Sequence, residues 1–249
     1  MSHSAAESRR LQDYRHHYRV DAEAIVDPQA LPPTRRASEG RRFEALVRLL
    51  RLRAGEKLLD MGCGSGWLAD RCQRAGAQVW AADIAFAGVA GARARYPQAG
   101  HFQVADVYHL PFAAGSFDAV VLSEVAEHLE DLPGALAEVA RLLRPGGRLL
   151  VSVPYRETIV EHLCIHCNRL TPANAHLHSF DEHKLATCLR GQGLVPGAFL
   201  LVNNKALELI GLPRWTRSWP YWAWRGLDRL STALVGRPAF LGMLAVKTG

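Results

Sequence analysis

Between residues 57 and 154 the sequence alternates short apolar runs with stretches of helical periodicity. Buried strands are expected at "EKLLDMG", "AQVWAADI", "HFQVAD", "FDAVVLSE" and "RLLVSVP", and helices at "SGWLADRCQRAG", "AFAGVAGARARY" and "LPGALAEVARLLRPGG". Strands joined by helices of this length run parallel, through right-handed crossovers. The alternation therefore predicts an α/β fold, with a doubly wound, mostly parallel sheet that helices cover on both faces.

The regular alternation stops at Pro154 and resumes with a helix in "SFDEHKLATCLRGQG" and strands in "LVPGAFLLVN" and "AFLGMLAVKT". These two strands bring the expected sheet to seven strands. Two inserts remain, one after the fifth strand at 155–178 and one between the last two strands at 204–238. We expect an N-terminal helical cap over 1–53, which includes the periodic stretch "RRFEALVRLL", and a main domain over 54–249.

A glycine-rich loop follows the first expected strand, in the pattern Asp60-x-Gly62-x-Gly64-x-Gly66. Ligands of open parallel sheets bind beyond the carboxyl ends of the strands, and glycine lets backbone amides approach them closely. The pattern departs from the dinucleotide fingerprint GxGxxG, and its leading carboxylate would repel a phosphate. An acid at this place suits a cationic ligand, such as S-adenosylmethionine, which has a sulfonium and an ammonium group and no phosphate.

Two more carboxylates stand at the ends of the next two expected strands. Asp83 ends "VWAAD", where a carboxylate can accept hydrogen bonds from both ribose hydroxyls. Asp106 ends "HFQVAD", where it can accept one from the adenine amino group. Acids at three successive strand ends beside a glycine loop indicate an adenosine-containing, positively charged ligand.

The chain resembles the class I S-adenosylmethionine-dependent methyltransferases of small-molecule type, with a domain similar to methyltransferase domain 11. The segments "LLDMGCGSG", "AADI", "VADVYHLPFAAGSFDAVVLSEVAEHLED" and "LLRPGGRLLVSVP" carry the resemblance over residues 55–153, and the last strand pair lies at 194–247. The resemblance implies a Rossmann-like fold, methyltransferase activity and S-adenosyl-L-methionine as the cofactor.

The resemblance also implies which residues surround the cofactor. Those after the first strand would meet its methionine part, those after the second and third its ribose and adenine, and a serine of the fourth would line the site. The residues are Asp60, Gly62, Cys63, Gly64, Asp83, Ile84, Asp106, Val107 and Ser123. By family analogy alone, Tyr14 and Tyr18 of the first helix would close over the cofactor.

The segment "SEVAEHLED" places Glu124, Glu127 and His128 on one face of a helical turn. It is similar to the metal-binding turn of ubiquinone-pathway O-methyltransferases, in which a divalent cation orients the acceptor. The alternative is that His128 acts as a general base for a hydroxyl substrate, with Glu124 as the second catalytic candidate. A third interpretation is that His128 only packs the loop, and all three stay open at this point.

A second cluster of metal-ligand types occurs in the insert 155–178. Cys164-x-x-Cys167 presents two thiolates, and His176-x-His178 follows after eight intervening residues. Two cysteines and two histidines complete a closed, structural zinc site, which would stabilise a segment that lacks a core of its own. His162 and His166 are alternative ligands, and free cysteines with scattered surface histidines are the alternative to any site.

The insert 204–238 is rich in tryptophan and arginine, as in "LPRWTRSWPYWAWRGLDRL". Residues 1–53 carry eleven arginines against seven acids, and residues 204–249 carry seven basic residues against two acids. Interleaved aromatic rings and arginines suit a lid over the substrate pocket that also touches a membrane surface. No long apolar run or secretory signal occurs, which favours the cytoplasm.

The expected function is methyl transfer from S-adenosylmethionine to a small quinone-like, lipid-like or natural-product-like acceptor. Nucleic-acid N-methylation is disfavoured, because no Asn/Asp-Pro-Pro-Tyr turn occurs. The alternatives are a protein or RNA methyltransferase that uses the basic flanks, and a non-catalytic, zinc-bearing interaction module on the same fold.

Overall fold

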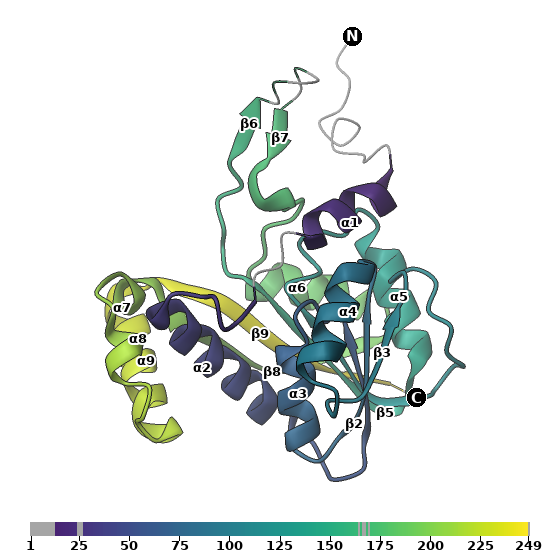
Figure 1. Ribbon diagram of the computed structural model, residues 1–249, viewed down its shortest axis with the longest axis horizontal. Helices are drawn as coiled ribbons and strands as arrows, with labels where there is room; N and C mark the ends of the chain where they lie inside the picture. Colours follow the sequence, from purple (N-terminus) through teal and green to yellow (C-terminus); the bar gives the residue numbers. More distant parts are fainter. Residues whose placement is uncertain (1–12, 24–26, 164, 166–167, 169, 249) are drawn as a thin grey trace.

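A computed structural model describes residues 13–23, 27–163, 165, 168 and 170–248. Its centre is a seven-stranded sheet in the order β3-β2-β1-β4-β5-β9-β8 (Figure 1). The first five of these strands in sequence pair in parallel, and β9 runs antiparallel to both of its neighbours. The strands are β1 (Lys57–Met61), β2 (Gln78–Asp83), β3 (His101–Val104), β4 (Phe117–Ser123), β5 (Leu143–Pro154), β8 (Leu194–Asn204) and β9 (Pro238–Lys247). This confirms the predicted mostly parallel, Rossmann-like sheet.

Helices cover both faces of the sheet. The helices around it are α1 (Tyr14–Glu23), α2 (Pro33–Leu50), α3 (Trp67–Arg74), α4 (Phe86–Arg95), α5 (Leu132–Leu142) and α6 (Glu182–Arg190). Helix α5 ends earlier than the stretch "LPGALAEVARLLRPGG" suggests, because Pro145 disfavours helix in the residues just before it.

Neighbouring residues of the central strands point to opposite faces, and each face has its own buried cluster. Leu58 and Leu150 pack with residues of α2 and α3, such as Leu46. Leu59 and Leu149 pack on the other face, in the cluster that holds the buried residues of α5 and α6. Because both faces are covered, the strands are apolar at nearly every position, as expected for a parallel sheet.

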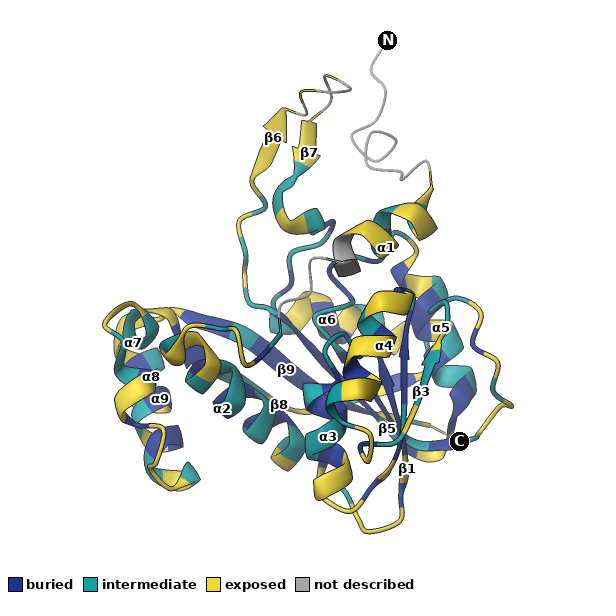
Figure 2. Cartoon of the chain, viewed as in Figure 1, coloured by how far each residue is buried: buried dark blue, intermediate teal, exposed yellow. Residues whose placement is uncertain are grey.

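The first insert, 155–178, holds a two-stranded hairpin and a short 3-10 turn. They are β6 (Glu161–Leu163), β7 (Leu170–Pro172) and η2 (Ala173–Ala175). The hairpin projects away from the sheet, on the side where α1 lies, and its described residues are largely exposed (Figure 2).

The second insert, 204–238, holds α7 (Lys205–Leu209), α8 (Leu212–Trp215) and α9 (Tyr221–Val235). These helices lie beyond α2, at the end of the molecule opposite the C-terminus (Figure 1). Arg41 of α2 fixes the connection between α8 and α9, since its Nη2 donates to the carbonyl oxygens of Thr216 at 3.0 Å and Trp219 at 2.5 Å.

Candidate active site

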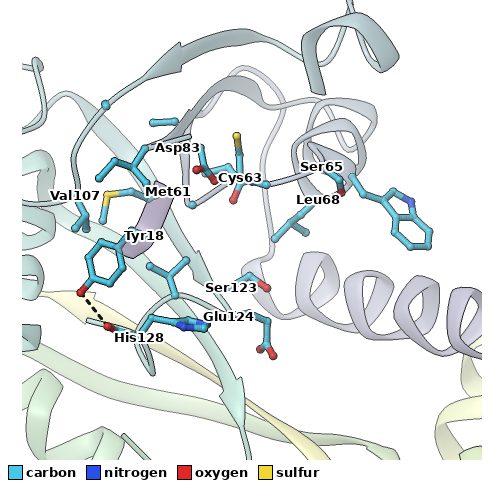
Figure 3. Close-up of a pocket in the computed structure, with 18 of the residues that line it drawn as sticks. Tyr18, Met61, Cys63, Ser65, Leu68, Asp83, Val107, Ser123, Glu124 and His128 are labelled. Atoms are coloured by element: carbon cyan, nitrogen blue, oxygen red, sulfur yellow. Dashed lines mark hydrogen bonds between the residues drawn. The ribbon is translucent and has the colours of Figure 1, made fainter. Parts of the chain in front are cut away.

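A cavity of about 370 Å³ lies at the carboxyl ends of β1, β2 and β4. Its walls come from the loop after β1, the turn after β4, and one side chain of α1 and two of α2 (Figure 3). Of the residues that the sequence predicted for cofactor or catalysis, these line it: Asp60, Gly62, Cys63, Gly64, Asp83, Ile84, Val107, Ser123, Glu124 and His128. The structure therefore brings the predicted strand-end residues together in one place.

The glycine loop is held tightly against its neighbours. The backbone amides of Gly62 and Cys63 both donate to the carbonyl oxygen of Ala82, at 2.8 and 3.0 Å. Gly62 has a φ of +74°, and a Cβ there would lie 2.3 Å from Cγ2 of Val125. A side chain at position 62 is therefore excluded both by the backbone conformation and by the turn after β4.

Gly66 serves packing at the start of α3. Its φ is +76°, and an added Cβ would lie 2.9 Å from Cβ of Ala92 and 3.2 Å from Cε1 of Phe102. The third glycine thus lets α3 approach α4 and β3 and does not line the cavity.

Two carboxylates from adjacent strand ends face the cavity. Asp83 is anchored, because Oδ2 accepts from the amide of Gly64 at 2.9 Å and Oδ1 from that of Ala85 at 3.0 Å. Asp60 is only 1% exposed, and within the described residues its Oδ2 has no hydrogen-bond partner. Burial, together with the negative charge of Asp83, raises the pKa of Asp60 to about 7. A buried carboxylate in this state favours a cationic ligand in the cavity.

Asp106 is the one predicted cofactor residue that does not line the cavity, although its neighbours Ala105 and Val107 do. Its Oδ2 instead accepts from the Tyr14 hydroxyl at 2.8 Å and from Nε of Arg15 at 3.0 Å. Helix α1 therefore engages this carboxylate, and its predicted contact with adenine stays a prediction.

Helix α1 also contributes the Tyr18 side chain to the cavity wall. The Tyr18 hydroxyl donates to the carbonyl oxygen of His128 at 2.9 Å and accepts from the amide of Glu130 at 3.0 Å (Figure 3). These two bonds seat α1 on the turn that follows β4.

That turn holds two acids, of which Glu127 is buried and Glu124 is partly buried. Glu124 has a positive φ of 57°, and its Oε1 lies 3.0 Å from Nη1 of Arg42. Burial raises the pKa of Glu124 to about 7 although the Arg42 charge opposes this. Glu127 is fully buried, and within the described part of the chain neither of its carboxylate oxygens has a hydrogen-bond partner. Burial and the Glu124 charge raise the pKa of Glu127 well above its usual range.

His128 and His176 stand beside these acids. Burial and the neighbouring His176 lower the pKa of His128 to about 4, so its imidazole is neutral at pH 7. The two rings lie 4.7 Å apart, edge to face. Nδ1 of His176 contacts a carboxylate oxygen of Glu157, and ligand atoms of Glu127, His128 and His176 all lie within 4.8 Å of one another. The insert 155–178 thus places His176 beside the motif that follows β4.

The predicted zinc ligands are only partly described. Cys164, Cys167 and the alternative ligand His166 lie outside the described residues. The Nε2 atom of His178 contacts the carbonyl oxygen of Leu129 at 2.8 Å, and the alternative ligand His162 is exposed on β6. The zinc site stays a prediction, while the described side-chain neighbours of His176 are Glu157 of the insert and His128 of the turn after β4.

Arg42 is a cavity residue that sequence reasoning missed. It is 4% exposed, and its guanidinium pairs with Glu39 at 2.7 Å and lies over the rings of Phe43 and Phe240. Nothing in the spacing of α2 distinguishes Arg42 from the other arginines of this arginine-rich chain. Phe43 from the same helix and Trp67 from α3 also line the cavity and were not anticipated.

The predicted lid, 204–238, contributes no residue to the cavity lining within the described residues. Its helices pack beside α2 and β8, and among the described residues no helix is long and apolar enough to cross a membrane. The roles of this insert as a lid and in membrane contact therefore stay predictions, as does the cellular location.

Residues 59–151 match the family model described as "Methyltransferase domain". The chain is 38% identical over 135 residues to methyltransferase GfsG of Streptomyces halstedii, a match that covers 51% of this chain and 47% of the relative. It is 36% identical over 151 residues to a ubiquinone biosynthesis O-methyltransferase of Xanthomonas axonopodis pv. citri (strain 306), covering 57% of this chain and 63% of the relative. These similarities support a class I S-adenosylmethionine-dependent methyltransferase domain over residues 59–151.

Solved methyltransferase structures share the fold. A Burkholderia thailandensis 1,6-didemethyltoxoflavin-N1-methyltransferase with bound S-adenosylhomocysteine superposes with a TM-score of 0.59 at 20% identity, over 94% of this chain and 85% of that one. The matches to the curated relatives above span about half to two thirds of those relatives' lengths. The methyltransferase family and fold predicted from sequence are thus confirmed, while the residue roles are not tested by these similarities.

Proposed function

We propose that this methyltransferase binds S-adenosyl-L-methionine in the cavity at the ends of β1 and β2 and methylates a small molecule held beside the turn after β4. The observation that carries the proposal is Asp60, a cavity-lining residue with a buried carboxylate whose Oδ2 has no hydrogen-bond partner in the described residues. A sulfonium or ammonium group would offset the cost of that buried charge.

The residues of the cavity fit such a cofactor. Gly62 keeps the loop free of a side chain, Asp83 is rigidly placed for a ribose, and Ile84 and Val107 offer apolar walls for an adenine. The bound cofactor would supply an electrophilic methyl group. The protein would contribute proximity, orientation and exclusion of water, which account for large rate effects in two-substrate reactions.

On the acceptor side, His128 and Glu124 are the proposed catalytic residues. A neutral imidazole at neutral pH is free to take up the proton that a hydroxyl acceptor loses as it is methylated. Glu124, with a pKa of about 7, changes its charge near neutrality beside the same cavity. Both side chains line the cavity from the turn after β4 (Figure 3).

A divalent cation is a second candidate for the same turn. The buried, unpartnered carboxylate of Glu127 and the short spacing of ligand atoms in Glu127, His128 and His176 favour it within the described residues. Excess EDTA tests the cation, since loss of turnover supports it and unchanged turnover eliminates it. The structural zinc proposed for Cys164, Cys167, His176 and His178 has its own test, which is elemental analysis of untagged protein.

One relative is a ubiquinone biosynthesis O-methyltransferase, and one solved structure of the same fold is a 1,6-didemethyltoxoflavin-N1-methyltransferase. These names support a small quinone-like, lipid-like or natural-product-like acceptor. Protein or RNA methylation and a non-catalytic role are the alternatives. Release of S-adenosylhomocysteine on a panel of small phenols, with protein and RNA extracts in parallel, distinguishes them, because a non-catalytic module would release none from any acceptor.

A further inference from the structure

Helix α9 turns an apolar face to solvent. Trp222, Leu230 and Leu234 are exposed by 76%, 57% and 77%, and their spacing places them on one side of the helix. An ordinary surface helix places its apolar residues inward and its charged residues outward. The outward face of α9 is therefore unpartnered among the described residues.

The inward face of α9 is polar and fixed in place. Arg225 is buried, and its Nη1 lies 2.6 Å from Oδ2 of Asp228 and 2.8 Å from the carbonyl oxygen of Leu201. Asp228 is also buried, and its Oδ1 accepts from the amide of Asn204 at 3.0 Å. Rotating the helix to bury its apolar stripe would break these contacts and expose Trp224, which packs with Ala45 and Val202. The apolar stripe is thus a stable property of the surface.

Exposed apolar residues also occur in α7, in α8 and in the segments that join these helices to α9. Of the eighteen large hydrophobic residues that are exposed in the described chain, eight fall within 204–238. They are Leu209, Ile210, Trp215, Trp219, Trp222, Leu230, Leu234 and Val235. Such a concentration of exposed apolar residues within one segment is typical of an interaction surface.

The exposed charges of the same helices are all basic. Within 205–237 the exposed charged residues are Lys205, Arg214, Arg217, Arg229 and Arg237, while Asp228 is buried and Glu208 is partly buried. Tryptophans and arginines around an apolar stripe suit the boundary between lipid headgroups and acyl chains. The uniform positive charge complements an anionic surface and would repel a second copy of the same face.

We propose that α7, α8 and α9 form a docking surface for an anionic lipid membrane, with the stripe of Trp222, Leu230 and Leu234 entering the headgroup region. The surface is separate from the methyl-transfer cavity, because no described cavity residue belongs to 204–238. The proposal is therefore independent of the acceptor and of the reaction.

The test is co-sedimentation of the full chain with vesicles. Phosphatidylcholine vesicles that contain phosphatidylglycerol should bind the native protein, pure phosphatidylcholine should bind it far less, and high salt should release it. The variant Trp222→Ser/Leu230→Ser/Leu234→Ser should lose binding. Arg214→Gln and Arg217→Gln should each weaken it about fivefold, from about 1 kcal/mol for each basic residue near an anionic surface.

A matched control is Phe86→Ser, which removes an aromatic side chain that is 75% exposed on α4, outside this surface. It should bind vesicles like the native protein. Thermal melts and S-adenosylhomocysteine calorimetry verify that each variant is folded. Native protein that ignores anionic vesicles, binds neutral ones equally, or instead forms a dimer that the triple variant dissolves would overturn the proposal.

Discussion

Replacing Asp60 by Asn should make the ligand-free protein more stable and the cofactor complex weaker. The carboxylate of Asp60 lies at the tip of β1, 1% exposed, with Asp83 as a like-charged neighbour. In the proposed function its burial serves a cationic ligand, and this burial costs stability when that ligand is absent. Asn keeps the size of the side chain and removes the charge.

The magnitude follows from the pKa of Asp60, which rises from 3.8 to about 7 on folding. Below the unfolded value the group is protonated in both states and costs nothing. As the pH rises toward 7, the unfolded chain ionises first, so stability is lost over this window and the loss levels off above it. A tenfold change in proton affinity corresponds to about 1.4 kcal/mol, which gives an upper limit of about 4 kcal/mol at pH 8.

The buried Asn amide has its own desolvation cost of about 1–3 kcal/mol, so the expected net gain at pH 8 is about 1–3 kcal/mol. For a domain of this size that raises Tm by about 2–12 °C. Melts of both proteins at pH 4.5 and pH 8, with calorimetry of S-adenosylmethionine, provide the measurement. The reasoning fails if Asn lowers Tm at pH 8, if the difference does not shrink at pH 4.5, or if cofactor affinity is unchanged.

Four further perturbations probe other parts of the site. Gly62→Ala should lower the free energy of unfolding by about 2–4 kcal/mol in urea titrations, because the new Cβ meets Val125 at 2.3 Å in a positive-φ conformation; a neutral result would contradict the loop geometry. Tyr18→Phe removes two hydrogen bonds and should weaken the docking of α1 by about 1–2 kcal/mol, seen as faster amide exchange in α1 with unchanged exchange in the sheet. If ionised Glu124 assists proton removal, turnover should rise as the pH passes about 7 and Glu124→Gln should flatten that rise; an unaltered pH profile counts against its role. Glu127→Gln should leave turnover and urea stability at pH 7 nearly unchanged if Glu127 is protonated, and should abolish turnover and its sensitivity to EDTA if a cation binds there.

The fold was predictable because it depends on local patterns. Apolar runs, such as the one that ends at Asp60, alternate with helical stretches at regular spacing along the sequence. Parallel strands are buried on both faces, so each of them appears as a nearly continuous apolar run. The pattern therefore predicts both the number of strands and the order of the elements. The strand-end residues were predictable for the same reason, since carboxyl ends of parallel strands meet at one edge. Asp60, Asp83 and Ser123 do so in the structure.

The remaining features depend on contacts between distant segments. Asp106 is engaged by Tyr14 and Arg15, more than ninety residues earlier in the chain. Arg42 lines the cavity from α2, and the residue spacing near the strand ends does not predict this contact. From the residue spacing we predicted that His176 shares a zinc site with two cysteines. Its described neighbours are Glu157 and His128, because the insert folds back onto the turn after β4.

The orientation of α9 also could not be predicted from the sequence. Trp222, Leu230 and Leu234 recur on one side of the helix, and such a period alone suggests that they face the protein. The structure shows the opposite orientation. The buried pair of Arg225 and Asp228 binds the backbone of β8, so Trp222 lies on the side that faces solvent.

Titration calorimetry with S-adenosylhomocysteine, and with a nicotinamide dinucleotide for comparison, tests the central assignment most directly. We expect one molecule of the sulfur compound to bind per chain and the dinucleotide to give no heat. Binding of the dinucleotide alone would mean that the acids at the strand tips serve some other ligand.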